Sequence, residues 1–289
     1  MVANRGDKPI FTSFIGGKLV EKGVTILQDN KIPNYRFPEH AISSFDVMVK
    51  HKMMLDLPKE EIKTFDVDKG RVKKILDEAV RAGQKDIPEY TARDIIESYG
   101  FGLPKSILAK DVAEAQSAAE KIGYPVVMKI ASPDILHKSD VGGVKVGLDD
   151  AEDVEAAFNE MMKIARSAVP NANIMGVLIQ EMVTGGKEVI LGMSRDPQFG
   201  PMLMFGLGGI YVEVLKDVAF RIAPILPREA TEMIDAIKSS ALLKGSRGER
   251  PVDIDSIKEG LLRLSQLVTD FPMIKELDIN PLKVFPSGA

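Results

Sequence analysis

Cysteine is absent from the sequence, and its absence removes several kinds of protein from consideration. Without cysteine the chain cannot form a disulfide scaffold, a thiolate zinc site or a cysteine nucleophile. An excess of basic charge is also missing, because 38 lysine and arginine residues face 42 aspartate and glutamate residues, which gives a net charge of −4. A protein that binds duplex nucleic acid normally carries a basic surface, so we expect no nucleic-acid partner.

Long apolar runs are missing as well. The longest uncharged apolar stretch, residues 199–212, has only 14 residues and includes four glycines and a proline. A membrane-spanning helix needs about 20 apolar residues, and the first ten residues contain no apolar targeting core. We therefore expect no membrane association and a cytoplasmic location.

The length of 289 residues predicts about two domains, and a hydrophobic fraction of 45% with a charged fraction of 28% is typical of a folded globular chain. Residues 8–52 alternate between strand-like and helical patterns. Two strands and two helices cannot cover both faces of a parallel sheet, so we expect this segment to be the tail of a domain whose other strands lie elsewhere. Residues 53–87 are rich in Lys, Glu and Asp, and we interpret them as a linker that contains a helix over 68–82.

From residue 88 onward, short strand patterns alternate with capped helix patterns. Asp111, for example, stands where a helix cap is expected, directly before VAEAQSAAEKIG. The strand patterns 174–183 and 187–196 are joined through Thr184-Gly185-Gly186, and this glycine turn predicts a hinge. We predict helices over 91–100, 112–123, 151–168, 228–237 and 255–269, and strands over 105–109, 124–131, 144–148, 174–183, 187–196 and 273–285.

The closing strand contains the first candidate site. Side chains alternate between the two faces of a strand, so Glu276, Asp278 and Asn280 are expected to share one face. Three oxygen-bearing side chains in a row suit magnesium, which commonly bridges one or two carboxylates to nucleotide phosphates. A half-exposed strand without a ligand gives the same pattern, and the pattern alone favours neither interpretation.

Lys129 is the second candidate, because it follows three apolar residues in PVVMKIAS on a strand that we expect to be buried. A buried lysine is costly unless it is paired or meets an anion, so a phosphate contact is one interpretation. The other is a lysine whose ammonium group reaches solvent at the strand end.

The glycines of FGLGGIYVEVLKD are the third candidate. Gly206, Gly208 and Gly209 stand directly before an expected helix, where bare backbone amides could receive a phosphoryl group. A tight turn without a ligand explains the glycines equally well. The sequence contains neither G-x-G-x-x-G nor G-x-x-x-x-G-K-[ST], which argues against Rossmann and P-loop nucleotide binding.

His137 is the fourth candidate, in the polar loop SPDILHKSDVGG. A neutral imidazole at pH 7 can act as a nucleophile, and a loop would let it travel, although most lone loop histidines have no catalytic role. The other two histidines, His40 and His51, lack the spacing of a zinc site.

These segments together resemble a known family. Four segments are similar to the ATP-grasp portion of ADP-forming acyl-CoA synthetases, and more distantly to the β subunit of succinyl-CoA synthetase. They are YTARDIIESYGFGLPKS, YPVVMKIASPDILHKSDVGGVKVGL, LIQEMVTGGKEVILGMSRDPQFGPMLMFGLGGIYVEVLKDVAFRIAPI and ELDINPL. The resemblance implies an α/β chain with two ATP-grasp lobes, 88–181 and 182–289. Upstream, KPIFTSFIGG and NKIPNYRFPEHAISSF resemble the end of a flavodoxin-like ligase-CoA domain, 1–52, which the linker 53–87 would join to the lobes.

The resemblance also implies a reaction and a set of residues. The reaction is reversible: acyl-CoA, ADP and phosphate give free acid, CoA and ATP through acyl phosphate and phosphohistidine. By resemblance, His137 carries the phosphoryl group, Lys129 holds the nucleotide phosphates and Glu188 faces ribose. The remaining implied sites are Glu181, Met182 and Val183 for adenine, Asp278 and Asn280 for magnesium, and Gly206 to Gly209 with Glu213 and Asp217 as the dock for phosphohistidine.

The sequence departs from the family pattern at two points. Chains of the family continue beyond the equivalent of residue 289 into a strand whose aspartate helps to bind magnesium, and they contain a CoA-binding domain with its own histidine. We therefore expect a fragment or one subunit of a split enzyme, which binds a CoA-binding partner half or self-associates. Two other functions stay open: an ATP-grasp ligase that joins a carboxylate to an amine, and a nucleotide sensor without turnover. Acetate, propionate-like acids and hydroxy acids are all possible substrates.

Overall fold

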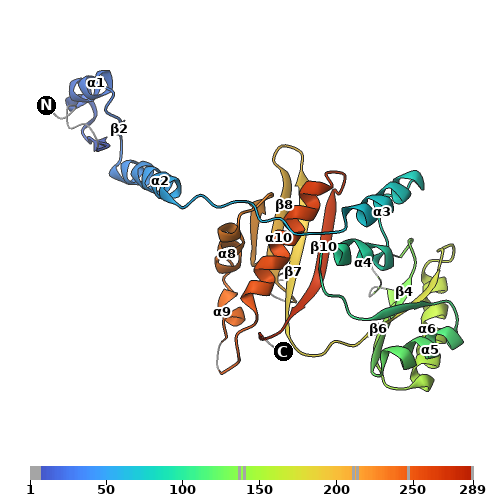
Figure 1. Ribbon diagram of the computed structural model, residues 1–289. Helices are drawn as coiled ribbons and strands as arrows, with labels where there is room; N and C mark the ends of the chain where they lie inside the picture. The colour runs from blue at the N-terminus through green and yellow to red at the C-terminus, as the bar shows by residue number, and fades with distance from the viewer. Residues whose placement is uncertain are drawn as a thin grey trace. The chain divides into compact units, whose positions relative to one another are not determined.

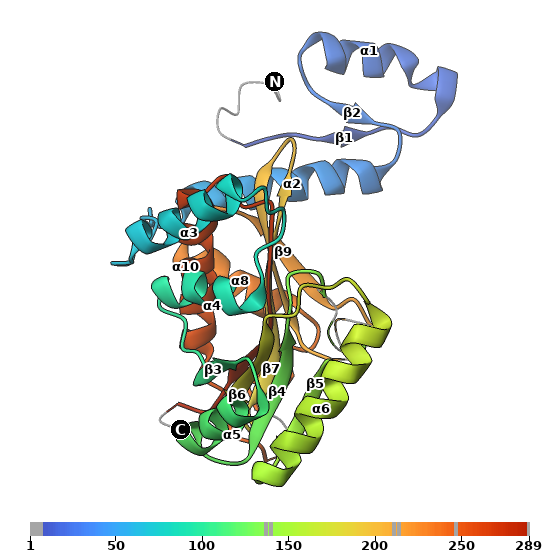
Figure 2. The ribbon, with the colours of Figure 1, turned by 90° about the vertical axis from the view of Figure 1, so that its right-hand side faces the viewer.

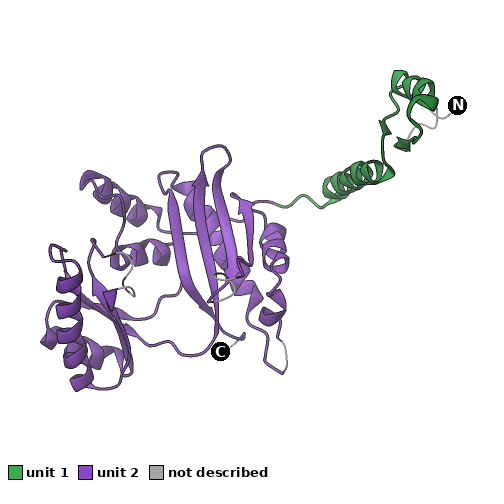
Figure 3. Ribbon diagram, turned by 180° about the vertical axis from the view of Figure 1, so that it is seen from behind, with its two compact units in different colours: residues 1–60 green, residues 61–289 purple. Residues whose placement is uncertain are grey.

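The computed structural model describes residues 8–135, 138, 141–209, 212, 215–245 and 248–287. The chain divides into two compact units, Met1–Glu60 and Glu61–Ala289, which Figure 3 shows in green and purple. Each unit is described by itself.

The first unit contains little that could serve as a core. Its elements are β1 (Thr12–Ser13), a 3-10 helix η2 (Gly17–Leu19), α1 (Glu21–Asp29), β2 (Asn34–Tyr35) and α2 (Pro38–Asp56). The two short strands pair in parallel. Ala41 is the one buried residue among those described here, whereas Ile42, Phe45 and Met48 of α2 are exposed. α2 continues to Asp56 and the two units divide after residue 60, so the expected boundary at residue 52 falls inside this helix.

The second unit contains two four-stranded sheets. The first sheet is antiparallel with strand order β3-β6-β4-β5. Its strands are β3 (Ser106–Ala109), β4 (Val126–Ala131), β5 (Val144–Leu148) and β6 (Gly176–Glu181), and its helices are α5 (Val112–Ile122) and α6 (Ala151–Ala168). Figure 2 shows both helices beside the strands. The Asp111 carboxylate accepts the N–H of Glu114 and so caps α5, as the sequence predicted.

Buried side chains of this sheet point toward α5 and α6. Met128 and Ile130 of β4 and Ile179 of β6 share one apolar cluster with Met161 of α6. Because side chains alternate along a strand, Lys129 belongs to the opposite face of the sheet. The sheet therefore directs Lys129 away from α5 and α6, to the face where it meets Glu89 at the start of α4.

The second sheet is also antiparallel, with strand order β10-β7-β8-β9. Its elements are β7 (Lys187–Asp196), β8 (Gly200–Leu207), β9 (Val218–Ile222), α8 (Pro227–Ala236), α9 (Ser240–Leu243), α10 (Ile254–Asp270) and β10 (Glu276–Val284). α8 and α10 lie across one face of the sheet (Figure 1), where Leu191 and Leu203 pack in the larger apolar cluster of the chain. The view from behind shows the other face of the strands (Figure 3).

Two helices that precede the first sheet in the chain pack with the second sheet in space. They are α3 (Lys69–Arg81) and α4 (Glu89–Ser98). Val72 and Leu76 of α3 and Ile95 of α4 are buried in the same cluster as Leu191 of β7. Part of the region expected as a linker, 53–87, is therefore a core element. The linker prediction failed for α3 because this helix packs against strands more than 100 residues later in the chain, and the charged composition of 53–87 does not reveal that packing.

Among the residues that the structure describes, no helix is both long enough and apolar enough to cross a membrane.

Candidate functional site

Lys129 lies on the face of β4 opposite α5 and α6, and its ammonium group is paired. Its Nζ is 2.9 Å from Oε1 of Glu89, the first residue of α4, and the Nζ of Lys138 bonds to the other oxygen, Oε2, of the same carboxylate. Burial by itself would raise the pKa of Glu89, but the two ammonium groups outweigh burial and hold this pKa below its ordinary value of 4.5. The three side chains are between 16% and 34% exposed, so a ligand can still reach them.

The backbone fixes Lys138 beside β4. Its carbonyl oxygen accepts the N–H of Gly143 at 2.7 Å, and the carbonyl of Gly143 accepts the N–H of Ile130 at 2.8 Å. A Cβ on Gly143 would stand 2.8 Å from the side chain of Ile130, so only glycine permits this approach. Lys138 directly follows His137 in the sequence. His137 itself lies outside the described residues, and its role stays a prediction.

The predicted hinge connects the two sheets. β6 ends at Glu181 and β7 begins at Lys187, and between them both Gly185 and Gly186 have positive φ angles, +73° and +74°. Glu181 is engaged with Lys105: its N–H donates to the Lys105 carbonyl at 2.9 Å, and its Oε2 accepts the Lys105 N–H at 3.2 Å.

The segment predicted for adenine continues from Glu181 through Met182 and Val183, which are both half-buried. The Nζ of Lys283, on β10, donates to the carbonyl of Val183 at 2.8 Å and lies 3.7 Å from Oε1 of Glu188. Lys283 therefore holds together the predicted adenine segment and the predicted ribose residue.

Glu188 also contacts the glycine-rich segment. Its carbonyl accepts the N–H of Gly208 at 2.7 Å, and a Cβ on Gly208 would be 3.0 Å from the Cβ of Glu188. Gly209 follows with a φ of +65° in open space, a conformation that favours glycine. The structure thus brings Gly208 against the predicted ribose residue, and the glycines serve a close approach of two chain segments.

Asp217 belongs to the predicted phosphohistidine dock, and its carboxylate is already partnered. Its two oxygens accept the backbone N–H groups of Lys238 and Ser239 at 2.8 and 2.7 Å. Burial would raise the pKa of Asp217, but the hydrogen bonds from Ser239 and Lys238 keep it below its ordinary value of 3.8. This carboxylate anchors the chain just before α9. Glu213 lies outside the described residues, so the dock stays a prediction.

The predicted magnesium residues lie on the open face of the second sheet. Asp278 pairs with Gly192, and Glu276 pairs with Ser194, so the two carboxylates share this face. Partial burial and the charge of Glu276 raise the pKa of Asp278, while a hydrogen bond from Asn280 acts in the opposite direction. A register shift follows Ile279, so the strict alternation assumed for Asn280 does not continue beyond this point.

The donor set of this face fits a hard divalent cation. Two neighbouring carboxylates and an amide oxygen are ligands that magnesium accepts, with phosphate oxygens and water completing its shell. Among the described residues, no three His, Cys, Asp or Glu side chains converge on a point that could hold a metal ion. The protein part of such a site would therefore be small, with Asp278 and Asn280 as the candidates.

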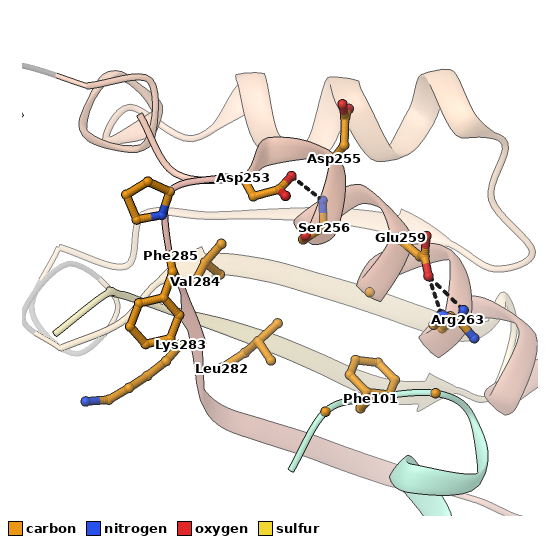
Figure 4. Close-up of a pocket in the computed structure, with 14 residues that line it drawn as sticks. Phe101, Asp253, Asp255, Ser256, Glu259, Arg263, Leu282, Lys283, Val284 and Phe285 are labelled. Carbon is orange, nitrogen blue, oxygen red and sulfur yellow. Dashed lines mark hydrogen bonds and ion pairs between the residues drawn. The ribbon is translucent and has the colours of Figure 1, made fainter. Parts of the chain in front are cut away.

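A pocket of about 510 Å³ opens elsewhere, between α10 and the end of β10 (Figure 4). Its acidic side chains have partners: Asp253 accepts the N–H of Ser256 at 2.9 Å, and Glu259 pairs with Arg263 at 2.7 Å. None of the residues predicted for the nucleotide or the phosphoryl group lines it. Lys283, which contacts Val183 and Glu188, also lines this pocket, so the pocket adjoins the segment predicted for the nucleotide.

Three residues of this site were missed by the sequence reasoning: Glu89, Lys138 and Lys283. Lys138 had a local signal, because it is a second cation within the histidine loop. Glu89 and Lys283 had none, since their partners are 40 and 100 residues away in the sequence.

Comparisons with known proteins identify the family. Residues 78–289 match the family described as ATP-grasp domain. The 4-hydroxybutyrate–CoA ligase (ADP-forming) of Nitrosopumilus maritimus is 48% identical over 284 residues, which cover 97% of this chain and 40% of that protein. The β subunit of acetate–CoA ligase (ADP-forming) I from Pyrococcus furiosus is 45% identical over 220 residues, 76% of this chain and 94% of the subunit.

A solved structure agrees with these relatives. The dinucleotide forming acetyl-coenzyme A synthetase 1 of Ca. Korarchaeum cryptofilum, in complex with coenzyme A, Ca-AMPCP and HgCl⁺, has a TM-score of 0.73 and 45% identity, and covers 75% of this chain and 94% of that chain. The chain spans about 40% of the length of the fused ligase and nearly the whole of the separate subunit. The ATP-grasp fold and the resemblance stated above are confirmed. The chain therefore belongs to the ATP-grasp family, in the group that includes the β subunits of ADP-forming acid–CoA ligases.

Proposed function

We propose that this chain is the nucleotide-binding and phosphoryl-carrying part of a reversible ADP-forming acid–CoA ligase. One observation carries the proposal: the ammonium groups of Lys129 and Lys138 meet on one carboxylate. One of these lysines projects from a strand of the sheet, and the other directly follows His137. His137 is therefore the sequence neighbour of a lysine that shares a carboxylate with the lysine proposed to bind the nucleotide phosphates.

The proposed step is a transfer between ATP and the imidazole of His137. A neutral ring nitrogen attacks the γ-phosphorus, and the bond from that phosphorus to the oxygen bridging it to the β-phosphate breaks. ADP leaves with the electron pair, and the other ring nitrogen releases its proton to solvent. In the reverse direction, ADP takes the phosphoryl group back. Lys129 and Lys138 would stabilise the charge on the phosphate oxygens in both directions.

The nucleotide would lie between the two sheets. Adenine would contact Glu181, Met182 and Val183, and the ribose would contact Glu188. Lys283 would hold Val183 and Glu188 in place, because its ammonium group contacts both residues. Bound magnesium would supply positive charge that offsets the negative charge of the nucleotide phosphates. Asp278 and Asn280 would hold it from the open face of the second sheet.

A CoA-binding half completes the proposal. The fused relative matches 97% of this chain, whereas the ATP-grasp match begins at residue 78, so the fused relative also matches the first unit. In that unit Ile42, Phe45 and Met48 are exposed, and Ala41 is the one described residue that is buried. We propose that this apolar surface packs against the rest of a flavodoxin-like CoA-binding domain, supplied by a partner half.

The proposal is tested by labelling the chain with ATP that carries ³²P at the γ position. We expect a label that is stable in base and labile in acid, the behaviour of a phosphohistidine, in the unmodified chain but not in the variant His137→Asn. His51→Asn changes an exposed histidine of α2 and is the matched control, which should be labelled like the unmodified chain. Equal labelling of His137→Asn would remove His137 from the reaction.

A further inference from the structure

Glu89 occupies the position at which nucleotide phosphates would meet Lys129. We propose that Glu89 is a positioning residue that fills the phosphate site in the nucleotide-free chain and is displaced when the phosphates bind. This inference rests on the proposed function, because it assumes that Lys129 binds phosphate. It adds Glu89 to the residues that determine nucleotide affinity.

The geometry of the carboxylate matches that of a phosphate group. Each oxygen of Glu89 takes one lysine, Oε1 the Nζ of Lys129 at 2.9 Å and Oε2 the Nζ of Lys138. Two oxygens of a phosphate could accept the same two donors. The anion site is therefore assembled before a nucleotide arrives, with a side chain of the protein in the place of the ligand.

Glu89 can leave this site more easily than the lysines can. Lys129 is fixed by the backbone pairing of β4 with β5 and β6, and Lys138 by the hydrogen bond of its carbonyl with Gly143. Glu89 lies instead in the first turn of α4, where the N–H groups of a helix start stabilise a negative charge. A displaced carboxylate would keep this favourable environment, so its displacement costs less than moving either lysine.

The charge balance favours the nucleotide in this exchange. One carboxylate on two ammonium groups leaves a net charge of +1, whereas a nucleotide brings several phosphate oxygens with more negative charge. The competition nevertheless weakens binding, because the apparent Kd for the nucleotide equals the Kd of the free site divided by the fraction of time in which Glu89 leaves the site free. Removal of the competing carboxylate should therefore strengthen binding, which is the opposite of what loss of a merely structural ion pair would do.

Calorimetric titration of the whole chain with ADP in the presence of magnesium tests this. If Glu89 leaves the site free for about a tenth of the time, Glu89→Gln should lower the Kd for ADP about tenfold. Glu97→Gln is the matched control, because Glu97 lies on the same helix and pairs with Arg71 instead of the two lysines. Lys138→Met placed in the Glu89→Gln background should raise the Kd again, since the phosphate then loses the ammonium group of Lys138 as a donor.

The outcomes are distinguishable. If the unmodified chain binds ADP and a folded Glu89→Gln binds it no more tightly, the inference is wrong and the proposed function is unaffected. If neither binds ADP, both are wrong. Glu89→Asp covers the case in which Glu89→Gln fails to fold: its side chain is one methylene shorter, reaches the two lysines less well, and should lower the Kd by a smaller factor.

Discussion

Gly185 and Gly186 offer a sharp test of the hinge, because they are neighbours with nearly equal φ angles. Their φ angles are +73° and +74°, so alanine at either position is strained. Their surroundings differ. A Cβ on Gly185 would meet no atom within 4 Å, whereas a Cβ on Gly186 would stand 3.1 Å from the ring of Phe285 and 3.1 Å from the carbonyl oxygen of Val284.

The expected free energies of unfolding follow from this difference. Alanine with a left-handed backbone costs about 1 to 2 kcal/mol, and the gain from a stiffer unfolded chain, about 0.4 to 1 kcal/mol, is common to both variants. Gly186→Ala must in addition push the end of β10 away, at a cost of about 1 to 3 kcal/mol. We therefore expect Gly186→Ala to be less stable than Gly185→Ala by about 1 to 3 kcal/mol.

Urea denaturation of the two variants measures this difference. The slope of free energy against urea should be the same in both variants, so that the difference in midpoint reports stability alone. Equal midpoints, or a lower midpoint for Gly185→Ala, would show that the hinge does not pack against the end of β10. If the prediction holds, ADP titration should also show weaker binding by Gly186→Ala than by Gly185→Ala, because the segment displaced in Gly186→Ala leads directly to Glu188.

Three further predictions concern buried or paired polar groups. Tyr99→Phe should lower the free energy of unfolding by about 1 to 3 kcal/mol, because the buried hydroxyl donates to Oδ2 of Asp270 at 2.8 Å; urea denaturation measures it, and no loss would show the bond to be unimportant. Folding raises the pKa of Asp278, so ionisation of this carboxyl opposes folding, and the free energy of unfolding should fall as pH rises from 3.8 through the higher folded pKa. At pH 7 in EDTA, Asp278→Asn should therefore be more stable than the unmodified chain. Equal stability of the two proteins would contradict the raised pKa. Folding lowers the pKa of Asp217, so the stability that its ionised carboxylate contributes is complete above pH 3.8 and is lost as pH falls through the lower folded pKa. The difference in free energy of unfolding between the unmodified chain and Asp217→Asn should vanish below that folded pKa. A difference that stays constant with pH would refute the lowered pKa.

Local patterns predicted most of the second unit. The predicted limits of 144–148, 151–168 and 187–196 are those of β5, α6 and β7. These segments have a clear hydrophobic period and a cap or a turn at their ends, which are properties of the nearby sequence. β9 was missed, because Val218–Ile222 directly follows a segment read as a glycine-rich nest and helix. α9 is only four residues long and has no periodic signal.

The partners within the site were less predictable than the elements. Lys129 was placed on a strand from its position after three apolar residues, and the structure confirms the strand. Its partner Glu89 starts a helix 40 residues earlier, and that helix packs with the other sheet. Such a contact depends on how two lobes are joined, and a single sequence contains no local pattern that determines it.

The charges of the site are largely balanced before any ligand binds, and the exception indicates where a ligand charge is needed. Glu89 balances one of the two lysine charges, Asp217 accepts two backbone N–H groups, and the pKa of each carboxyl is lowered. Asp278 differs, since its pKa is raised and its charged neighbour is another carboxylate, Glu276. A carboxylate that is disfavoured in its charged form is stabilised by a cation rather than by a further anion. The negative nucleotide should therefore enter at the lysines on the first sheet, and the metal at Asp278 on the second, so that the two lobes contribute opposite charges to one bound complex.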